Sequence, residues 1–427
     1  MTRYSTLAIV LIALLRLPCY HASKLPHSNH KLARWKLSTF TTLLSTSLGS
    51  TIAHASSPIQ PKKAMRPYLY SVEFTSPPSL LPRTKIGEGN SIKRFCKADV
   101  VLLGEHPRKE DDKALCLQIL QNMVKTNPTN KRIVLGLEMI EQPFQSYLDD
   151  YLKSTSTMEE ADRLLYEGTQ WGKRWKFAFE PYLPLLHFAK SNQIPLIALG
   201  APTESVNSIV SGGFEGLSDD DRNKYILDGQ GFVDFVRLPG FKRYTDRVIL
   251  PSYDFYASNK LLGDNPSPEK FFASRIFKDE AIAGKAAQYI AANSNTMMVA
   301  LVAMEHAKFG FGAQERLKYR LASLRGTSPP SAEDLAVPPS RRILSTIGNG
   351  RDVLSVLLNP SARDSSSETA QLTLSLAYGQ FLDESRPLAD YIWFSNYPES
   401  KLLTRPKNAV NNEGEKPPGE SSIIGAF

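Results

Sequence analysis

Short runs of consecutive apolar residues alternate along the chain with longer segments in which apolar positions recur every three to four residues. The short runs predict buried strands, and the longer segments predict amphipathic helices. The predicted strands lie at 99–103, 132–138, 194–200, 296–304, 352–358 and 390–395. The predicted helices lie at 111–125, 141–153, 157–168, 176–192, 202–211 and 276–293. Alternation of fully apolar strands with helices predicts an α/β fold, with a mostly parallel central sheet flanked by helices.

The same pattern predicts how the chain is divided. Residues 140–192 hold successive helical patterns without a strand, which predicts a helical subdomain inserted after the second predicted strand. We expect the α/β domain to cover residues 85–400. A Pro-rich linker at 56–84 precedes it, and a polar, disordered tail at 401–427 follows it. Residues 1–55 have the composition of a targeting leader.

The leader contains two kinds of targeting signal in series. Arg3 precedes the apolar run Leu7–Leu15, which is too short to span a bilayer and is typical of a signal-peptide core. An acid-free segment rich in Ser, Thr, His and Lys follows and ends in Ala53-x-Ala55. This order predicts import into a complex plastid, and the final motif favours the thylakoid lumen. The alternative is a secreted protein with a low-complexity propeptide. We expect no transmembrane span in the mature chain.

The net charge of +8 comes from the first 65 residues, which comprise the leader and the start of the linker. Eight of the 51 lysines and arginines lie in residues 1–65, which contain no acidic residue. The remaining 43 basic residues balance the 43 acidic ones. A neutral domain lacks the basic surface that nucleic acids require, so we expect no nucleic-acid partner.

The cysteines do not form a metal-binding motif. Cys19 lies in the leader, and Cys96 and Cys116 show neither CxxC nor CxxH spacing. This spacing excludes a zinc finger and favours two buried thiols, with a disulfide as the alternative.

Acidic and histidine side chains follow the predicted strands. Glu105 and His106 follow the first strand, Glu138 closes the second, and His306 follows the fourth, again next to a glutamate. Because the carboxyl ends of parallel strands share one edge, where ligands bind, we expect Glu105, Glu138 and His306 to cluster there. The only other histidine outside the leader is His187. The alternatives are a solvated loop for the first pair and a packing role for His187.

Aromatic residues form a second candidate feature. Trp171 and Trp175 stand four residues apart and would share one helical face, with Tyr182 continuing the stripe. Such a stripe suits a flat ligand, although the spacing alone favours packing of the helix on the domain core. Gly172 interrupts the helical pattern at this point.

Four segments resemble, in order, the blocks of a known family. They are VVLLGEHPRKEDDKALCLQIL, IVLGLEMIEQPFQSYLDDYL, WGKRWKFAFEPYLPLLHFAKSNQIPLIALGAPTE and VALVAMEHAKFGFGAQERL. They resemble the ChaN-like haem-binding uptake proteins of the Tiki superfamily, which also includes erythromycin-esterase-like enzymes and metal-dependent proteases. The resemblance covers roughly residues 98–322, together with ADYIWFS near the end of the chain.

The resemblance implies an α/β core with a helical subdomain, haem bound between the two, and two protomers paired around the haems. The positions that match the family are Glu105, Glu138, Trp171, Trp175, Tyr182, Asp279 and His306. One departure concerns the first motif, which in the family usually reads Gly-Glu-x-His. Here His106 occupies the x position and Pro107 replaces the histidine. Metal-dependent hydrolysis that requires that histidine is therefore disfavoured.

The leading hypothesis is a protein that binds haem or a related tetrapyrrole and handles or traffics it within a plastid compartment. Under this hypothesis His306 and Tyr182 are the expected iron ligands. His106, Trp171 and Trp175 are expected to contact the cofactor, and a homodimer is expected from the resemblance.

Two other hypotheses remain open from the sequence. The first is a metal-dependent hydrolase of the Tiki or erythromycin-esterase type, in which Glu105, Glu138 and His306 hold a divalent metal or act as general base. The second is a non-catalytic scaffold that keeps the fold and has lost the site.

The leader generates a first prediction. Because the apolar segment before residue 56 ends in Ala53-x-Ala55, the mature chain is expected to begin near Ser56. N-terminal sequencing of the native protein checks this. Recovery of native protein with residues 1–50 intact would contradict it.

Overall fold

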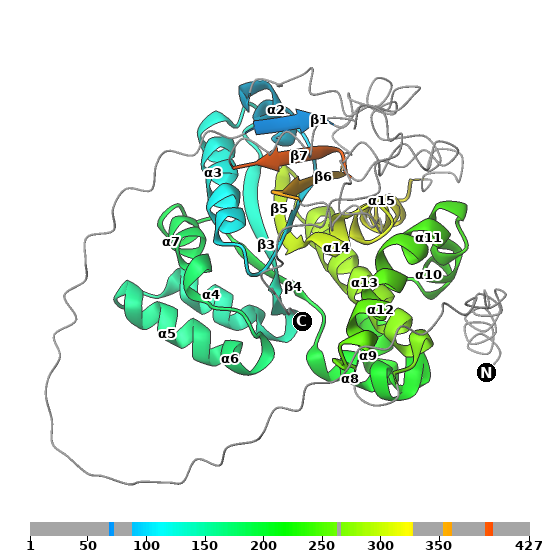
Figure 1. The fold of residues 1–427 in the computed structure, drawn as a ribbon. Helices are drawn as coiled ribbons and strands as arrows, with labels where there is room; N and C mark the ends of the chain where they lie inside the picture. Colours follow the sequence, from blue (N-terminus) through cyan, green and yellow to red (C-terminus); the bar gives the residue numbers. More distant parts are fainter. Residues whose placement is uncertain (1–67, 72–87, 263–265, 328–352, 361–388, 396–427) are drawn as a thin grey trace, which may run out of the picture. The chain divides into compact units, whose positions relative to one another are not determined.

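The computed structural model describes residues 68–71, 88–262, 266–327, 353–360 and 389–395 (Figure 1). All of them belong to one compact unit, Arg66–Phe427. The expected leader (1–55) and tail (401–427) lie outside the described residues.

The described residues form a seven-stranded sheet in the order β1-β7-β6-β2-β5-β3-β4. The strands are β1 (Tyr68–Ser71), β2 (Val100–Glu105), β3 (Arg132–Glu141), β4 (Leu196–Gly200), β5 (Thr296–Ala303), β6 (Val353–Leu358) and β7 (Tyr391–Phe394). β1 runs antiparallel to β7, and every other pairing is parallel. The expected α/β fold with a mostly parallel sheet is confirmed. All six strands predicted from apolar runs are present, whereas β1 lies in the segment expected to be a linker.

Helices cover both faces of the sheet, which explains why its strands are apolar throughout. One face carries Val101 and Leu103, which share a core with α3 (Glu110–Thr126) and α7 (Leu183–Ser191). The other face is covered by α13 (Pro268–Ala292) and α15 (Ala313–Leu324), which pack on β5 and β6 (Figure 1). Because successive residues of a strand point to opposite faces, a sheet buried on both sides requires apolar residues at every position.

The predicted helical insertion lies between β3 and β4. It contains α4 (Gln145–Lys153), α5 (Met158–Gly168), α6 (Trp171–Arg174) and α7, with 3-10 turns at Gln142–Phe144 and Glu180–Tyr182. The helix predicted at 176–192 is shorter than expected, since its regular part begins only at Leu183. Pro181 and Pro184 lie in its first turns, where a missing backbone N–H is tolerated.

A second helical insertion between β4 and β5 was mostly missed. It contains α8 (Thr203–Gly212), a 3-10 turn (Gly213–Gly216), α9 (Asp219–Tyr225), α10 (Gly229–Val236), α11 (Pro239–Tyr244), a π-helical turn (Thr245–Ile249) and α12 (Leu250–Ser258). Of the helices between β4 and β5, the sequence predicted only α8 and part of α13. The helices between these two have six to nine residues and are too short to display a clear period.

Two further helices complete the described elements, α2 (Glu88–Phe95) and α14 (Met304–Ala307). None of the helices in the described ranges is both long and apolar enough to cross a membrane.

The contact between β3 and β4 generates a second prediction. A Cβ at Gly200 would lie 2.4 Å from the carbonyl oxygen of Glu138 and 3.0 Å from that of Ile140. These are backbone atoms that cannot rotate away, so Gly200→Ala is expected to lower the free energy of unfolding by about 1–3 kcal/mol. Urea unfolding measures this. Gly89→Ala is the control, because nothing lies within 4 Å of its new methyl group. Equal stabilities of the two variants would refute the steric explanation.

Candidate functional site

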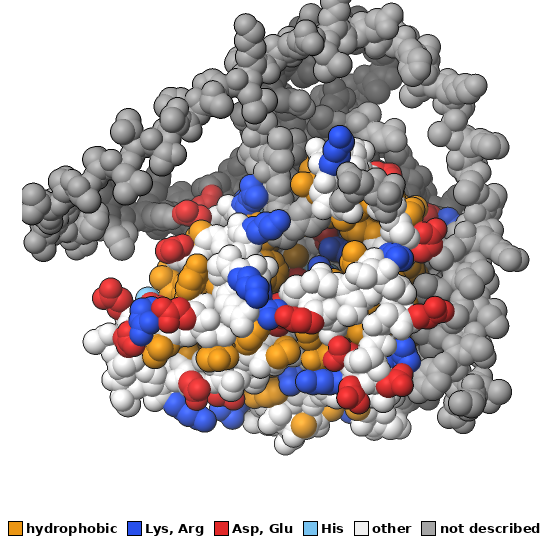
Figure 2. Space-filling view, turned by 90° about the horizontal axis from the view of Figure 1, so that it is seen from below, with side chains coloured by type: hydrophobic (Ala, Val, Ile, Leu, Met, Phe, Trp, Pro, Cys, Tyr) orange, Lys and Arg blue, Asp and Glu red, His pale blue; other side chains and the backbone are white. Residues whose placement is uncertain are grey.

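Three of the residues singled out from the sequence lie at the carboxyl edge of the sheet. Glu105 ends β2, Glu138 lies in β3, and His306 lies in α14 directly after β5. β5 pairs with both β2 and β3, so the three positions are neighbours along the edge. Figure 2 views this end of the described molecule and shows a hollowed surface in which hydrophobic and basic side chains lie below the rim.

His306 lies between two carboxylates. Its Nδ1 is 2.5 Å from Oδ1 of Asp279, and its Nε2 is 3.2 Å from Oε1 of Glu138. The hydroxyl of Tyr244 donates to the other oxygen of Asp279 at 2.8 Å. The backbone N–H of Ala303 donates to the other oxygen of Glu138. His306 is only 1% exposed, so its ring nitrogens face these carboxylates and not solvent.

This arrangement keeps the imidazole protonated. Burial by itself would lower the pKa of His306, but Glu138 and Asp279 outweigh it and raise the pKa to about 9. Burial likewise would raise the pKa of Glu138, but the charge of His306 lowers it to about 2. At neutral pH the group is therefore an imidazolium between carboxylates, and an imidazolium cannot accept a proton as a general base.

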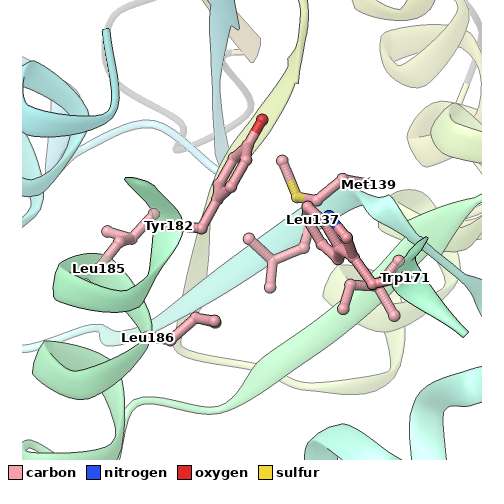
Figure 3. A pocket seen from close by; sticks show the side chains of 7 residues that line it. Leu137, Met139, Trp171, Tyr182, Leu185 and Leu186 are labelled. Carbon is pink, nitrogen blue, oxygen red and sulfur yellow. The ribbon is translucent and has the colours of Figure 1, made fainter. Parts of the chain in front are cut away.

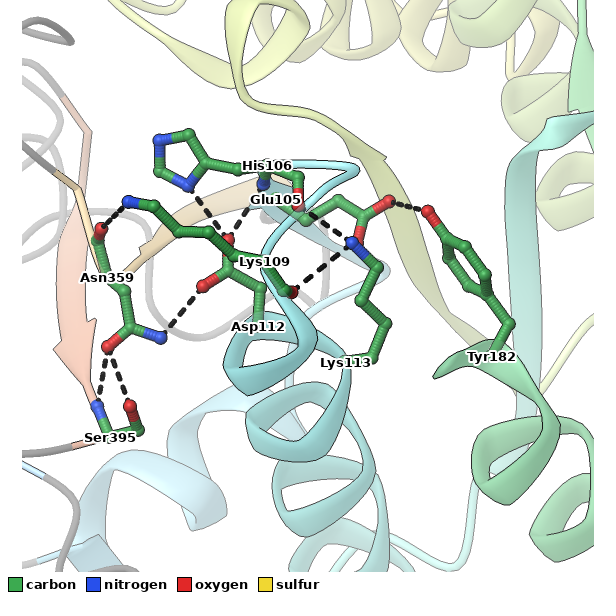
Figure 4. Close-up of polar contacts among 8 residues, drawn as sticks. All are labelled: Glu105, His106, Lys109, Asp112, Lys113, Tyr182, Asn359 and Ser395. Carbon is green, nitrogen blue, oxygen red and sulfur yellow. Dashed lines mark hydrogen bonds and ion pairs between the residues drawn. The ribbon is translucent and has the colours of Figure 1, made fainter. Parts of the chain in front are cut away.

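Glu105 belongs to a separate pair of contacts (Figure 4). Its Oε2 lies 2.9 Å from Nζ of Lys113, and its Oε1 accepts a hydrogen bond of 2.7 Å from the hydroxyl of Tyr182. Lys113 also donates to the carbonyl oxygen of His106 at 2.7 Å. Burial raises the pKa of Glu105, although the charge of Lys113 acts in the opposite direction. Burial also raises the pKa of Tyr182 well above its usual value. Tyr182 is thus a phenol, and the Glu105 carboxylate already faces a cation.

His106 is the strand-end histidine that solvent can reach. Its side chain is 21% exposed, and its Nδ1 lies 2.8 Å from Oδ2 of Asp112 (Figure 4). Asp112 is fully buried and also accepts hydrogen bonds from the backbone N–H of His106 at 2.7 Å and from Nδ2 of Asn359 at 2.8 Å. A carboxylate fixed in this way orients the imidazole ring. Neither Asp112 nor Asn359 was among the site residues expected from the sequence, and no local signal pointed to Asn359.

The aromatic residues form a packed cluster instead of a helical stripe. Helix α6 ends at Arg174, and Trp175 has extended backbone, so the expected continuous helix is wrong, but the rings of Trp171 and Trp175 still pack together, with centroids 6.4 Å apart. Gly172 disfavours a longer helix at this point. Trp171 is buried, with its ring centroid 5.3 Å from that of Tyr182.

Trp175 is half-buried and lies nearer the loop that follows β2. Its ring centroid is 5.7 Å from that of Phe177. The guanidinium of Arg108, two residues after His106, lies 5.9 Å from the Phe177 centroid. The loop that carries His106 therefore reaches the aromatic pair Trp175–Phe177.

An apolar pocket lies beneath this cluster (Figure 3). Its lining residues are Leu137, Met139, Ile140, Trp171, Tyr182, Leu185 and Leu186. The Tyr182 hydroxyl points away from it, toward Glu105. Its free space is about 10 Å³, room for about one water molecule, whereas pockets that enclose drug-sized ligands have roughly 300–1,000 Å³. A tetrapyrrole does not fit inside the pocket as it stands.

The remaining residues considered from the sequence lie away from this edge or are inert. His187 pairs with Asp162 through Nε2 at 2.7 Å, and Asp162 also accepts from the Tyr151 hydroxyl at 3.0 Å, which agrees with a packing role. Cys96 and Cys116 are free, buried thiols, as favoured. Across the described ranges, no group of three or more His, Cys, Asp or Glu side chains is arranged to hold a metal ion.

The His306 pair generates a third prediction. Because the pKa of His306 is raised above its unfolded value of 6.5, its stabilising effect is complete below that pH and is lost as pH rises through about 9. Glu138→Gln removes one of the two carboxylates, so the pKa of His306 falls. The variant should therefore be much less stable than the natural protein near pH 6, and this difference should shrink above pH 9. Denaturant unfolding across pH 5.5–10 measures this. A difference that stays constant over the range would contradict the charge pairing.

Comparison with known proteins identifies the family. The family model "Haem-binding uptake, Tiki superfamily, ChaN" matches residues 91–317, more than half of the chain. "Protein RETICULATA-RELATED 5, chloroplastic" of Arabidopsis thaliana is 24% identical over 311 residues, which cover 71% of this chain and 35% of that relative. This chain thus spans about a third of the relative's length. The structure "Cofacial heme binding to ChaN of Campylobacter jejuni" aligns with 77% of this chain and 96% of its own, at 16% identity and a TM-score of 0.46. On the family match, this protein belongs to the ChaN family of haem-binding uptake proteins in the Tiki superfamily.

Proposed function

We propose that this protein binds haem or a related tetrapyrrole at the carboxyl edge of its sheet and handles or traffics it within a plastid. Membership of a haem-binding family supports the ligand class. The leader composition and the chloroplastic relative support the plastid, and the Ala53-x-Ala55 motif favours the thylakoid lumen over secretion. The observation that carries the site is the exposed imidazole of His106, held by the buried Asp112.

The donor set at His106 fits haem iron. A hydrogen bond from Nδ1 to a buried carboxylate makes Nε2 the nitrogen that would coordinate a metal. Haem supplies four equatorial donors of its own, so one or two axial donors from the protein suffice. Trp175 and Phe177 would line the face of the ring, and Arg108 lies beside them as a cation.

His306 and Tyr182, the iron ligands expected from the sequence, suit a supporting role better. Both nitrogens of His306 face carboxylates, and the Tyr182 hydroxyl donates to Glu105. Both side chains are almost completely buried, as is Trp171. In our proposal these three residues form the layer beneath the ligand and hold the strand ends in position.

Pairing of two protomers around the ligand is also part of the proposal and rests on the family resemblance. The hydrolase alternative has less support. The imidazolium of His306 cannot serve as a base, and Lys113 neutralises Glu105. A metal-dependent hydrolytic rate that Glu105→Gln abolishes, in a protein without a haemin difference spectrum, would reverse this ranking.

Haemin titration tests the axial ligand. Haemin added to the mature protein is expected to give a shifted Soret band. We expect His106→Ala to remove this shift and Asp112→Asn to weaken haemin binding about 10–100-fold, because the ring loses its orienting carboxylate. His187→Ala is the matched control, since that histidine is also paired with an aspartate but lies elsewhere.

Circular dichroism should show that all these variants remain folded. If His106→Ala retains the shift while folded Tyr182→Phe or His306→Gln loses it, the iron ligand is one of the buried residues and our assignment is wrong. If the natural protein gives no haemin spectrum, the proposed function itself fails.

A further inference from the structure

The asparagine that follows β6 reaches the carboxylate behind His106. Nδ2 of Asn359 donates a hydrogen bond of 2.8 Å to Oδ1 of Asp112 (Figure 4). The other oxygen of Asp112, Oδ2, accepts from the backbone N–H of His106 at 2.7 Å and lies 2.8 Å from Nδ1 of its ring. The Asp112 carboxylate is therefore held at both oxygens, which fixes its rotation and the direction in which it faces the imidazole.

The side-chain amide of Asn359 can have only one orientation. Its Oδ1 accepts hydrogen bonds from the backbone N–H of Ser395 at 2.7 Å and from the hydroxyl of Ser395 at 2.9 Å. A backbone N–H can only donate, so the amide atom that faces it must be the oxygen. The NH₂ group then faces Asp112, which suits a carboxylate because a carboxylate only accepts. The hydrogen-bond chain from Ser395 to His106 therefore runs in one direction.

The backbone of Asn359 holds this side chain in place. Its φ of 45° lies in the left-handed region, which asparagine adopts more readily than most residues that have a side chain. Its N–H donates to the carbonyl oxygen of Trp393 at 2.8 Å. Its own carbonyl oxygen accepts from Nζ of Lys109 at 3.2 Å. The residue is thus tied to β7 on one side and to the start of α3 on the other.

The last two described strands bring these groups to the site. β6 pairs with β2 on the side opposite to β5, and β7 pairs with β6. Asn359 directly follows β6 and Ser395 directly follows β7, so both lie at the carboxyl edge of the sheet. Asp112 is fully buried. Loss of the Asn359 donor would leave a buried carboxylate oxygen without the hydrogen bond that offsets its removal from water.

We propose that Asn359 is a positioning residue for the site at His106 and that it acts through Asp112. It holds the carboxylate in the rotation at which Oδ2 accepts from the Nδ1–H of His106, so that Nε2 is the nitrogen left to bind a ligand. This role rests on the proposed function, under which that ligand is haem iron. β6 and β7 thereby determine the orientation of a histidine that neither strand carries.

The alternative is a purely structural role, because the same hydrogen bonds join α3 to β6 and β7. The two roles differ in what depends on Asp112. If Asn359 acts on His106 through Asp112, its replacement has no further effect on ligand binding once the carboxylate is gone. If Asn359 only supports the fold, the two replacements act independently and their effects add.

The test uses variants that separate the amide from the backbone. Asn359→Gly removes the amide and keeps the left-handed conformation, which glycine adopts without strain. Asn359→Asp keeps the size and the ability to accept from Ser395, but has no N–H to donate to Asp112. Asn295→Gly is the matched control, because Asn295 also has a positive φ, 59°, but precedes β5 at the opposite edge of the sheet.

Two measurements are made on the mature protein. Nitrogen NMR without ligand, with the His106 signals assigned by their loss in His106→Ala, shows which ring nitrogen carries the proton when the ring is neutral. Absorbance titration measures the affinity for haemin.

We expect the Nδ1–H tautomer of His106 in the natural protein and in Asn295→Gly, and a mixture of both tautomers in the two Asn359 variants. Both Asn359 variants should bind haemin about three- to tenfold more weakly, because Asp112 loses one hydrogen bond. In a protein that carries Asp112→Ala, Asn359→Gly should cause no further loss.

An unchanged tautomer in both Asn359 variants would overturn the proposal, as would a loss of haemin affinity by the same factor with and without Asp112. If these variants do not fold, as judged by circular dichroism, Ser395→Ala takes their place, since it removes one of the two donors to Asn359. A smaller shift toward mixed tautomers is then expected, and no shift would reject the proposal.

Failure of the natural protein to bind haemin would defeat the proposed function separately. In that case the tautomer of His106 still decides. Mixed tautomers in the Asn359 variants would support the positioning role, and an unchanged tautomer would reject it.

Discussion

The burial of charged side chains at the ends of β2, β3 and β5 is the constraint on which the rest of this structure depends. A buried charge is tolerated only when an opposite charge and hydrogen bonds satisfy it, and breaking such a pair is strongly destabilising. His306 meets this condition through Glu138 and Asp279. These contacts join β3, α13 and the turn after β5, so they fix the height and rotation of α13 against the sheet.

The same rule operates on both sides of the sheet. On one side, Lys113 and Tyr182 satisfy Glu105 and thereby connect β2, α3 and the start of α7. On the other, Glu280 accepts hydrogen bonds from Arg316 at 2.7 Å and Arg320 at 2.6 Å, which joins α13 to α15. Such pairs contribute little net stability compared with apolar packing, but they permit only one arrangement of the elements. We therefore regard the edge as a rigid layer built from paired charges.

The function that we propose uses the groups that this rigid layer leaves accessible. His106 is oriented from below by Asp112 and is partly exposed above it. The loop that carries His106 reaches the aromatic pair Trp175 and Phe177 through the cation Arg108. An axial donor, a flat apolar wall and a cation are the three components that a tetrapyrrole with acidic side chains requires. The replacement of the family's usual histidine by Pro107 is compatible with this use, because haem needs fewer protein donors than a bare metal ion does.

The sequence by itself determined the strands, their parallel arrangement and the chemical types of residue at their carboxyl ends. These features are local: a fully apolar run marks a strand buried on both faces, and a parallel sheet brings the following residues to one edge. It also determined the helical insertion between β3 and β4. The short helices of the second insertion escaped prediction because their length carries no period.

Only the tertiary structure decided which partner each polar side chain takes. Tyr182 and Glu105 are 77 residues apart in the chain, and Asn359 and Asp112 are 247 apart. Strand pairing and the two insertions bring these groups together, and no local pattern records that. For the same reason the sequence ranked His306 above His106 as a ligand. In our proposal, burial between two carboxylates reverses that order, and burial is a property of the assembled fold.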